Sequence, residues 1–252
     1  MGGTPKWAMV SIAVPGSLWD NAFVDKFYEG WHKLAGKYSV ELIGGDISRS
    51  PDRVVIDSMV GGEVPRGKAI LRSGAKPGDL IYVSGSLGGA ARGLELLSPD
   101  LYELKSVPRE MSELQARQAT PMPQVELGIK LLSTGAVTSM IDVSDGLSSE
   151  ILHICKDSGL GCVLYEEKIP VAGEMKNAAF KFEIDPTACA LSGGEDYELL
   201  FTIPQTEYEK LILNEDISVI GYMTEVEQGA QIITKGGSRH AITAQGWSHM
   251  KQ

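Results

Sequence analysis

The sequence predicts an α/β (α+β) fold built from two domains, on three observations. Segments rich in β-forming residues alternate with segments of helical periodicity along most of the chain. Residues 61–79 are rich in Gly, Pro and basic residues, and we place the domain boundary there, with an N-terminal domain over 1–70 and a C-terminal α/β domain over 71–252. The 252 residues are 43% hydrophobic and 22% charged, which is enough core-forming material for one large domain or two modest ones.

The N-terminal domain is expected to begin with a strand over Trp7–Val14, almost at the terminus. Ser17 and Asp20 resemble a capping box, and they introduce an amphipathic helix over 18–35. Tyr28 lies one step off the apolar stripe of this helix and is a candidate ligand contact. The stripe itself is assigned to the core and consists of Phe23, Phe27, Trp31 and Leu34.

A short strand over Val40–Ile43 is expected to end at Gly44, Gly45 and Asp46. Glycines permit close approach of the backbone to a ligand, and a carboxylate at a strand end suits a metal, but this tip alone is more often a simple turn. A further strand is expected over Arg53–Val60.

The C-terminal domain is expected to continue the alternation of strands and helices. The predicted strands are Leu80–Val83, Met140–Ile141, Gly161–Tyr165, Tyr197–Ile203, Ile217–Gly221 and Gln231–Thr234. The predicted helices are a segment ending at Leu97, then Arg109–Gln118, Val125–Leu132, Leu147–Lys156 and 205–213.

Two features before Leu97 have a functional and a structural interpretation. Arg72 is a candidate phosphate contact, although its spacing alone favours a solvated linker charge. The glycine-rich segment 84–93 follows a strand, but its spacing matches neither the dinucleotide fingerprint nor the P-loop. Tight helix packing is therefore the favoured role of those glycines.

The stretch Ser139–Glu150 is the most informative in the chain. An apolar run leads to Asp142, and Ser144 and Asp145 precede a helix. Carboxylates at this point can hold a hard cation against a phosphate bound at the helix N-terminus. The alternative is that Ser144 or Asp145 merely caps the helix. The spacing of two carboxylates three residues apart favours more than a cap.

Composition excludes several classes of function. The formal net charge of −10 argues against non-specific binding of nucleic acid. No apolar run approaches the length of a membrane span, and the start has no signal-peptide pattern, so we expect no membrane association and a cytoplasmic location. The widely spaced cysteines and scattered histidines argue against a zinc or thiol site. The three cysteines are Cys155, Cys162 and Cys189.

The acidic residues at predicted strand ends suggest one chemistry. Asp46, Asp142 and Asp145 are joined by Glu195 and Asp196, with no histidine or cysteine near the predicted strand ends. An oxygen-only set suits Mg²⁺ that arrives with phosphate groups. Phosphoryl transfer depends mainly on positioning and charge neutralisation, so the residues suggest a nucleotide-dependent transferase without a P-loop.

The chain also resembles the thiamine-monophosphate kinase family of the aminoimidazole-ribonucleotide-synthetase-like superfamily, from Met1 nearly to the C-terminus. The resemblance is carried by short motifs that occur in order: Met1-Gly-Gly-Thr-Pro-Lys6, Ile43-Gly-Gly-Asp46, Arg72-Ser-Gly-Ala-Lys-Pro-Gly-Asp79, Tyr82-Val-Ser-Gly-Ser-Leu-Gly88, Pro121-Met-Pro-Gln-Val125, Met140-Ile-Asp-Val-Ser-Asp-Gly-Leu147 and Leu191-Ser-Gly-Gly-Glu-Asp-Tyr-Glu-Leu-Leu-Phe201. The last two favour this kinase over the selenophosphate and purine-pathway synthetases.

The resemblance implies Mg²⁺-dependent phosphorylation of thiamine monophosphate by ATP, a homodimer formed through the N-terminal domain, and ATP held between the domains. It assigns metal binding to Asp46, Asp142 and Asp145. It assigns contacts with ATP to Tyr28, Gly45, Asp46, Arg72 and Ser144. It assigns contacts with the thiamine moiety to Glu195 and Trp247, a carboxylate and an aromatic face that both suit a cationic ring.

The acceptor chemistry agrees with this assignment, because a phosphate monoester is largely ionised at neutral pH and needs no general base. Direct in-line transfer from ATP is expected, with no catalytic side chain.

The chain departs from the family pattern at its start, where the family has further strands and metal-binding aspartates. We therefore expect an incomplete N-terminal domain and little kinase activity from residues 1–252. Two rivals stay open: another ATP-dependent synthetase of the superfamily, and a non-catalytic nucleotide-binding remnant.

Overall fold

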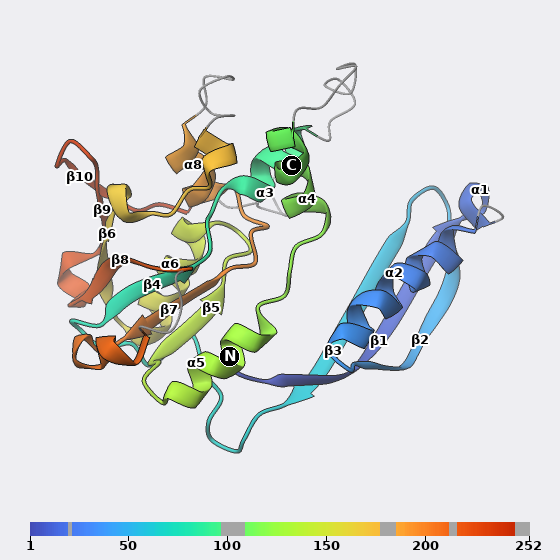
Figure 1. Cartoon of the computed structure of the whole chain (residues 1–252), viewed down its shortest axis with the longest axis horizontal. Helices are drawn as coiled ribbons and strands as arrows, with labels where there is room; N and C mark the ends of the chain where they lie inside the picture. The colour runs from blue at the N-terminus through green and yellow to red at the C-terminus, as the bar shows by residue number, and fades with distance from the viewer. Residues whose placement is uncertain (20–21, 97–108, 177–184, 212–215, 245–252) are drawn as a thin grey trace. The chain divides into compact units, whose positions relative to one another are not determined.

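The computed structural model describes residues 1–19, 22–96, 109–176, 185–211 and 216–244. It divides into two compact units, a smaller one of Gly2–Ala69 and a larger one of Met1 together with Ile70–Gln252. Both combine helices with β-sheet, which confirms the predicted α/β class (Figure 1). Asp20 and Trp247 lie outside the described residues.

The smaller unit is a three-stranded sheet in the order β2-β1-β3. β1 (Thr4–Pro15) pairs in parallel with β2 (Glu41–Ser50) and antiparallel with β3 (Val55–Glu63). A short helix, α1 (Gly16–Trp19), leads to α2 (Phe23–Lys37), which lies along the sheet (Figure 1).

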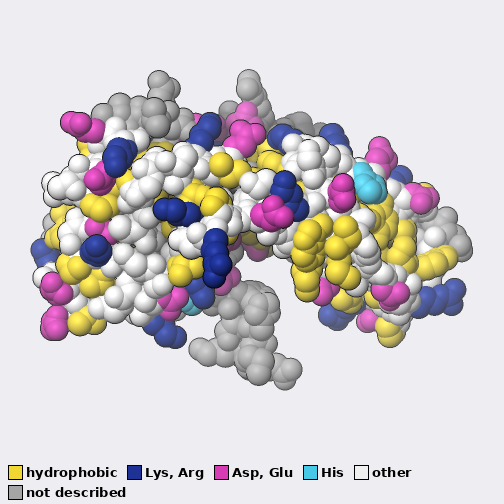
Figure 2. Space-filling model, turned by 90° about the horizontal axis from the view of Figure 1, so that it is seen from below, with side chains coloured by type: hydrophobic (Ala, Val, Ile, Leu, Met, Phe, Trp, Pro, Cys, Tyr) yellow, Lys and Arg dark blue, Asp and Glu magenta, His cyan; other side chains and the backbone are white. Residues whose placement is uncertain are grey.

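The two faces of the central strand β1 differ in exposure. Along β1, Ala8, Val10, Ile12 and Val14 are buried, as expected for the face that α2 covers. The alternate residues point to the other face, where large apolar side chains are exposed. They are Trp7, Met9, Val55 and Met59, with exposed fractions of 36%, 43%, 59% and 61%. Figure 2 shows such hydrophobic side chains at the surface of the molecule.

The larger unit is organised around a seven-stranded sheet in the order β10-β9-β6-β8-β4-β7-β5. All neighbours are antiparallel except β6 and β9. The strands are β4 (Leu80–Ser84), β5 (Ser139–Asp142), β6 (Gly161–Tyr165), β7 (Leu199–Ile203), β8 (Ile217–Thr224), β9 (Ala230–Ile233) and β10 (Arg239–Ala241).

Helices cover this sheet on both faces, so it has two hydrophobic cores. On one face α6 contributes Leu147, Ile151 and Ile154. On the other face α5 contributes Leu131. The α-helices of the unit are α3 (Gly89–Leu96), α4 (Arg109–Ala119), α5 (Val125–Thr134), α6 (Leu147–Ser158) and α8 (Pro186–Ser192), and its 3₁₀-helices are η2 (Glu166–Lys168), η3 (Gln205–Leu211) and η4 (Val226–Gln228). Within the described ranges, no helix has the length and apolar character needed to cross a bilayer.

Four sequence-based boundaries need correction. The helix expected over 18–35 is interrupted, because Ala22 adopts a left-handed φ of 51° before α2. The strand expected to end at Ile43 continues to Ser50, since β1 supplies pairing partners throughout. The helix expected over 205–213 is the 3₁₀-helix η3 as far as Leu211. Tyr197 lies before β7 rather than in it.

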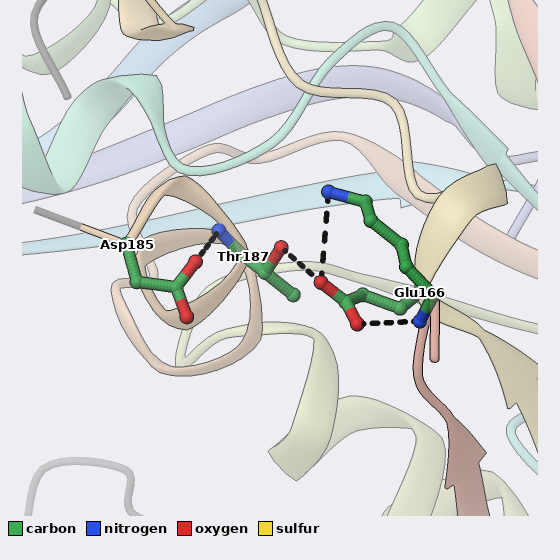
Figure 3. A network of polar contacts seen from close by, with 4 residues as sticks. Glu166, Asp185 and Thr187 are labelled. Atoms are coloured by element: carbon green, nitrogen blue, oxygen red, sulfur yellow. Dashed lines mark hydrogen bonds and ion pairs between the residues drawn. The ribbon is translucent and has the colours of Figure 1, made fainter. Parts of the chain in front are cut away.

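The α-helix α8, the strand β10 and the 3₁₀-helices η2 and η4 were not predicted. The signal for α8 is Asp185-Pro186, since the Asp185 carboxylate caps the helix by accepting from Thr187 N at 2.8 Å and Pro fits the first turn. Figure 3 shows that Thr187 Oγ1 also donates to Glu166 at 3.2 Å. Glu166 in turn accepts from the backbone N–H of Lys235 at 3.0 Å, so this carboxylate joins η2, α8 and the turn between β9 and β10.

Candidate functional site

The junction of β5 and α6 carries three of the predicted site residues. β5 ends at Asp142, which is half-buried; Ser144 is half-buried and Asp145 is exposed. Gly146 is the residue that precedes α6, with a φ of 101°, and no side chain caps the helix. A Cβ on Gly146 would lie 2.7 Å from the Leu191 carbonyl oxygen, so a larger residue does not fit. The alternative that Ser144 or Asp145 caps α6 is therefore wrong.

Glu150 holds this junction from within α6. Its Oε1 accepts from Ser144 N at 3.1 Å, Ser144 Oγ at 3.0 Å and Asp145 N at 2.9 Å. Glu150 is 1% exposed, and its Oε2 has no partner among the described residues. The buried carboxylate fixes the two residues that precede Gly146 and leaves the Asp145 side chain directed to solvent.

The segment Gly194–Glu198 packs against the same junction. Glu195 N donates to Ser144 O at 2.8 Å, Tyr197 N donates to Val143 O at 2.9 Å, and Val143 N donates to Glu198 O at 2.8 Å. A Cβ on Gly194 would overlap the Ser144 carbonyl oxygen, so glycine is required for this approach. Glu195 and Tyr197 both adopt left-handed φ values, 60° and 52°, which side-chain-bearing residues rarely do.

Tyr197 lies among the carboxylates of the junction. Its hydroxyl donates to Glu195 Oε2 at 3.0 Å. Burial is the largest cause of the raised pKa of Tyr197. The hydrogen bond to Glu195 and the negative charges of Glu195, Asp142 and Asp145 raise this pKa further. The negative charges of Glu195, Asp142 and Asp145 thus all act on the Tyr197 hydroxyl, and negative charge of this kind attracts cations.

The carboxylates here fit Mg²⁺ bound in part by phosphate and water. Asp142 and Asp145 make no side-chain hydrogen bond or ion pair with another described residue, so their oxygens are available as ligands. Among the described side chains, no three of His, Cys, Asp and Glu gather closely enough to form a complete metal site. That is the pattern expected for Mg²⁺, which keeps several waters and uses one or two carboxylates.

Arg72 is exposed, and its guanidinium lies 3.4 Å from an oxygen of Asp157. Asp157 is near the end of α6, about 15 Å along the helix axis from its first residue. The ion pair therefore holds Arg72 near the opposite end of α6 from Ser144. Both side chains are partly exposed, so the pair is weak and exchangeable.

In the smaller unit, Gly45 and Asp46 lie within β2, not at its end as predicted. A Cβ on Gly45 would overlap the carbonyl oxygen of Val10, so this glycine is needed by the neighbouring strand. Asp46 is exposed and lies beside Ser11, which has Asp57 on its other side. Paired residues share a face, so two carboxylates flank Ser11 on the face opposite Val10.

Tyr28 is half-buried on α2, with its ring centroid 5.2 Å from that of Phe27 in an edge-to-face arrangement. It therefore packs partly with the aromatic stripe of the helix.

Three residues that contribute to these sites were missed by the sequence analysis: Asp57, Glu150 and Tyr197. Asp57 becomes visible only through strand register. Glu150 looks like any acidic residue in the first turn of a helix, and the alternation of apolar residues after Tyr197 placed it in a strand.

Family comparisons cover most of the chain. Residues 1–64 match the model described as AIR synthase related protein, N-terminal domain, and residues 76–233 match AIR synthase related protein, C-terminal domain. A thiamine-monophosphate kinase from Bacillus subtilis (strain 168) is 35% identical over 256 residues, covering 100% of this chain and 77% of that protein. One from Aquifex aeolicus (strain VF5) is 35% identical over 248 residues, covering 98% of this chain and 75% of that protein.

Solved structures agree. The structure described as AaThiL complexed with AMPPCP and TMP matches with a TM-score of 0.84 and 32% identity, over 99% of this chain and 75% of that chain. A thiamine-monophosphate kinase from Stenotrophomonas maltophilia K279a matches with a TM-score of 0.82 and 30% identity, over 92% of this chain and 73% of that chain.

Proposed function

Since the chain belongs to the AIR synthase related proteins and, among them, to the thiamine-monophosphate kinases, we infer that it phosphorylates thiamine monophosphate with ATP. The products are thiamine diphosphate and ADP. An oxygen of the substrate phosphate forms the new bond to the γ-phosphorus of ATP, and the bond from that phosphorus to the β,γ-bridging oxygen breaks. The acceptor is already ionised at neutral pH, so no side chain has to remove a proton.

The observation that carries this assignment at residue level is the β5–α6 junction with its unpaired carboxylates. We propose that Asp142 and Asp145 hold Mg²⁺ there and that Ser144 contacts an ATP phosphate. Bound Mg²⁺ neutralises phosphate charge during transfer. The fixed orientation that Glu150 gives to Ser144 and Asp145 supports both roles.

The remaining roles are proposed residue by residue. In the larger unit, Arg72 contacts an ATP phosphate after leaving Asp157, and Glu195 contacts the thiamine cation, oriented by the Tyr197 hydroxyl. In the smaller unit, Asp46 binds Mg²⁺, and Gly45 and Tyr28 contact the nucleotide. Trp247, proposed to stack on the thiamine ring, lies outside the described residues.

The family resemblance also suggests a role for each domain and a second copy of the chain as partner. We propose that residues 1–70 form the nucleotide and dimerisation domain and residues 71–252 the second domain. A second copy of the chain is proposed to cover the apolar face of the smaller unit, because Met9 and Met59 are paired there and both are exposed.

Sedimentation of wild type and of Met9→Lys tests the proposed dimer: the wild type should sediment as a dimer and the variant as a monomer. A monomeric wild type would contradict it.

The function is tested by incubating the chain with ATP, Mg²⁺ and thiamine monophosphate and measuring thiamine diphosphate by chromatography. Product should depend on Mg²⁺ and on the substrate phosphate, so unphosphorylated thiamine is the matched control. The full-length Bacillus subtilis relative, assayed in parallel, tests the expectation of low turnover by residues 1–252. A protein that forms no product and binds neither ATP nor thiamine monophosphate would overturn the assignment.

A further inference from the structure

A pocket in the larger unit is separate from the carboxylates of the β5–α6 junction. Its volume is about 380 Å³, within the range of small-molecule sites. One wall comes from α4 and the turn that follows it, and the other from the segment after Glu195. The lining residues that matter here are Glu113, Arg117, Met122, Gln124, Asp196 and Glu198.

Hydrogen bonds fix the two carboxylates on the second wall, including one from Gln124 on the first wall. Glu198 Oε2 accepts from Ser84 Oγ at 2.5 Å and from Gln124 Nε2 at 3.1 Å. Asp196 accepts from the backbone N–H groups of Gly88 at 2.7 Å and Ala90 at 3.2 Å. Their orientation is therefore set before any ligand arrives, which lowers the entropy lost on binding.

One oxygen of this set is available to a ligand. Glu198 Oε1 accepts no hydrogen bond from the residues that the structure describes, although Glu198 lines the pocket. The glycine at position 85 makes room for it, since a Cβ there would overlap this carboxylate. A carboxylate oxygen in such a position is completed by an N–H donor.

Charge also favours a donor over an anion. Arg117 is the cation among the lining residues, against the acidic Glu113, Asp196 and Glu198. Burial raises the pKa of both Asp196 and Glu198, and Arg117 partly opposes this. A ligand with N–H groups or positive charge stabilises these buried carboxylates, which have lost part of their hydration. A phosphate group would be repelled by their negative charge.

We propose that this pocket binds an amino-substituted nitrogen heterocycle, with its exocyclic amino group donating to Glu198 Oε1 and a neighbouring ring nitrogen accepting from the pocket's donors, Gln124 or Arg117. The inference rests on the proposed function, because the two proposed substrates each carry such a heterocycle. These are the aminopyrimidine ring of thiamine monophosphate and the adenine ring of ATP. The pocket's negative charge favours the first, because thiamine is a cation. Asp196, which lines the pocket, follows Glu195 directly in the sequence.

The test is equilibrium binding of thiamine monophosphate, and separately of ATP with Mg²⁺, to the full chain by calorimetry. Glu198→Gln should weaken thiamine monophosphate binding about tenfold, the equivalent of one hydrogen bond to a charged group, and leave ATP binding unchanged. Oxythiamine monophosphate, which carries an oxo group in place of the amino group, should bind wild type about tenfold more weakly and bind Glu198→Gln no worse than thiamine monophosphate does.

A second test variant, with two controls, keeps the test decisive if Glu198→Gln folds poorly. Met122 is 49% exposed, so Met122→Trp should fill the pocket without disturbing the core and weaken the same ligand. Val226→Trp, at an exposed site on η4, and Glu227→Gln are the matched controls and should bind both ligands as wild type does.

Each outcome has one meaning. Loss confined to ATP binding would support the pocket with adenine as its occupant. Folded Glu198→Gln and Met122→Trp proteins that bind both ligands normally would overturn the proposal while leaving the kinase assignment intact. A wild type that binds neither ligand would instead count against the kinase assignment.

Discussion

Glu150 and Ser144 share two hydrogen bonds across the start of α6, one from the Ser144 backbone N–H and one from its hydroxyl. The same oxygen of Glu150 accepts from Asp145 N. A helix therefore uses a residue of its own first turn to fix the loop that precedes it, and that loop bears the proposed ligands for metal and phosphate.

Glu150→Ala should lower the free energy of unfolding by about 1–3 kcal/mol, because three donors at the junction lose their acceptor. It should also weaken the binding of ATP with Mg²⁺ more than the binding of ATP without Mg²⁺. Urea unfolding and calorimetry measure the two effects. Glu126→Ala, at an exposed position in the first turn of α5, is the control and should change neither. Full stability in Glu150→Ala would show that the bonds are dispensable.

Asp142→Asn and Asp145→Asn should each reduce the Mg²⁺-dependent part of ATP affinity roughly tenfold, which corresponds to about 1.4 kcal/mol. Neither side chain makes a hydrogen bond or salt bridge within the described residues, and the Met1 ammonium group interacts with Asp142 only through its charge, so melting temperatures should change little. Titration of ATP with Mg²⁺ and with EDTA separates the two contributions. Asp52→Asn, at an exposed site, serves as control. Equal losses with and without Mg²⁺ would argue against a metal role.

Tyr197→Phe should weaken thiamine monophosphate binding by about threefold to tenfold, because the hydroxyl that orients Glu195 is lost. ATP binding to the same preparation is the internal control and should be unchanged. Combining Tyr197→Phe with Glu195→Gln in a double-mutant cycle should show non-additive losses. Strict additivity would mean that the two side chains act independently.

Tyr82→Phe should stabilise the protein by about 1 kcal/mol. Burial raises the pKa of Tyr82 to about 12, and its hydroxyl has no partner among the described residues. The ring stacks on Phe201 at 5.5 Å, a contact that phenylalanine retains. Tyr222→Phe, on the adjacent strand β8, is the half-buried control. A loss of stability in Tyr82→Phe would reveal a bound water or another acceptor.

Glu166→Gln should change how stability depends on pH. The pKa of Glu166 is lowered, chiefly by the hydrogen bond from Lys235 N and also by Thr187 and the Lys235 ammonium group. A lowered pKa means that its stabilisation is complete above the unfolded value of about 4.3 and is lost as pH falls through the folded value. Wild type should therefore have a higher free energy of unfolding than Glu166→Gln at pH 6, and the difference should shrink as pH falls through the folded pKa of Glu166. A difference that does not shrink as pH falls would exclude this cause, and Glu225→Gln is the exposed control.

Much of the larger unit could be predicted from the sequence, because the patterns that indicate its helices and strands lie within short segments. Leu147–Lys156 has helical periodicity and folds as a helix, and Leu80–Val83 and Gly161–Tyr165 are compact runs of β-formers that form strands. Asp142, Ser144 and Asp145 are adjacent in sequence, so their common location needed no tertiary information.

What could not be predicted depends on partners distant in the chain. Asp46 was placed at a strand end because Gly44-Gly45 looks like a turn, whereas pairing with β1 keeps those residues extended. Asp57 comes beside Ser11 only through the antiparallel register of β1 and β3. Tyr197 followed an apolar alternation, yet its contact with Val143 turns it out of the strand.

The backbone at Glu195 and Tyr197 has a consequence for engineering. Both positions adopt the conformation that glycine accepts without strain, and each side chain held there destabilises the fold by about 1–2 kcal/mol. A laboratory selection for heat resistance alone would drift toward glycine at these two sites. Because Glu195 is proposed to contact thiamine, oriented by Tyr197, the selected proteins should bind thiamine monophosphate more weakly, and any thermostable lineage should be screened for affinity as well as for melting temperature.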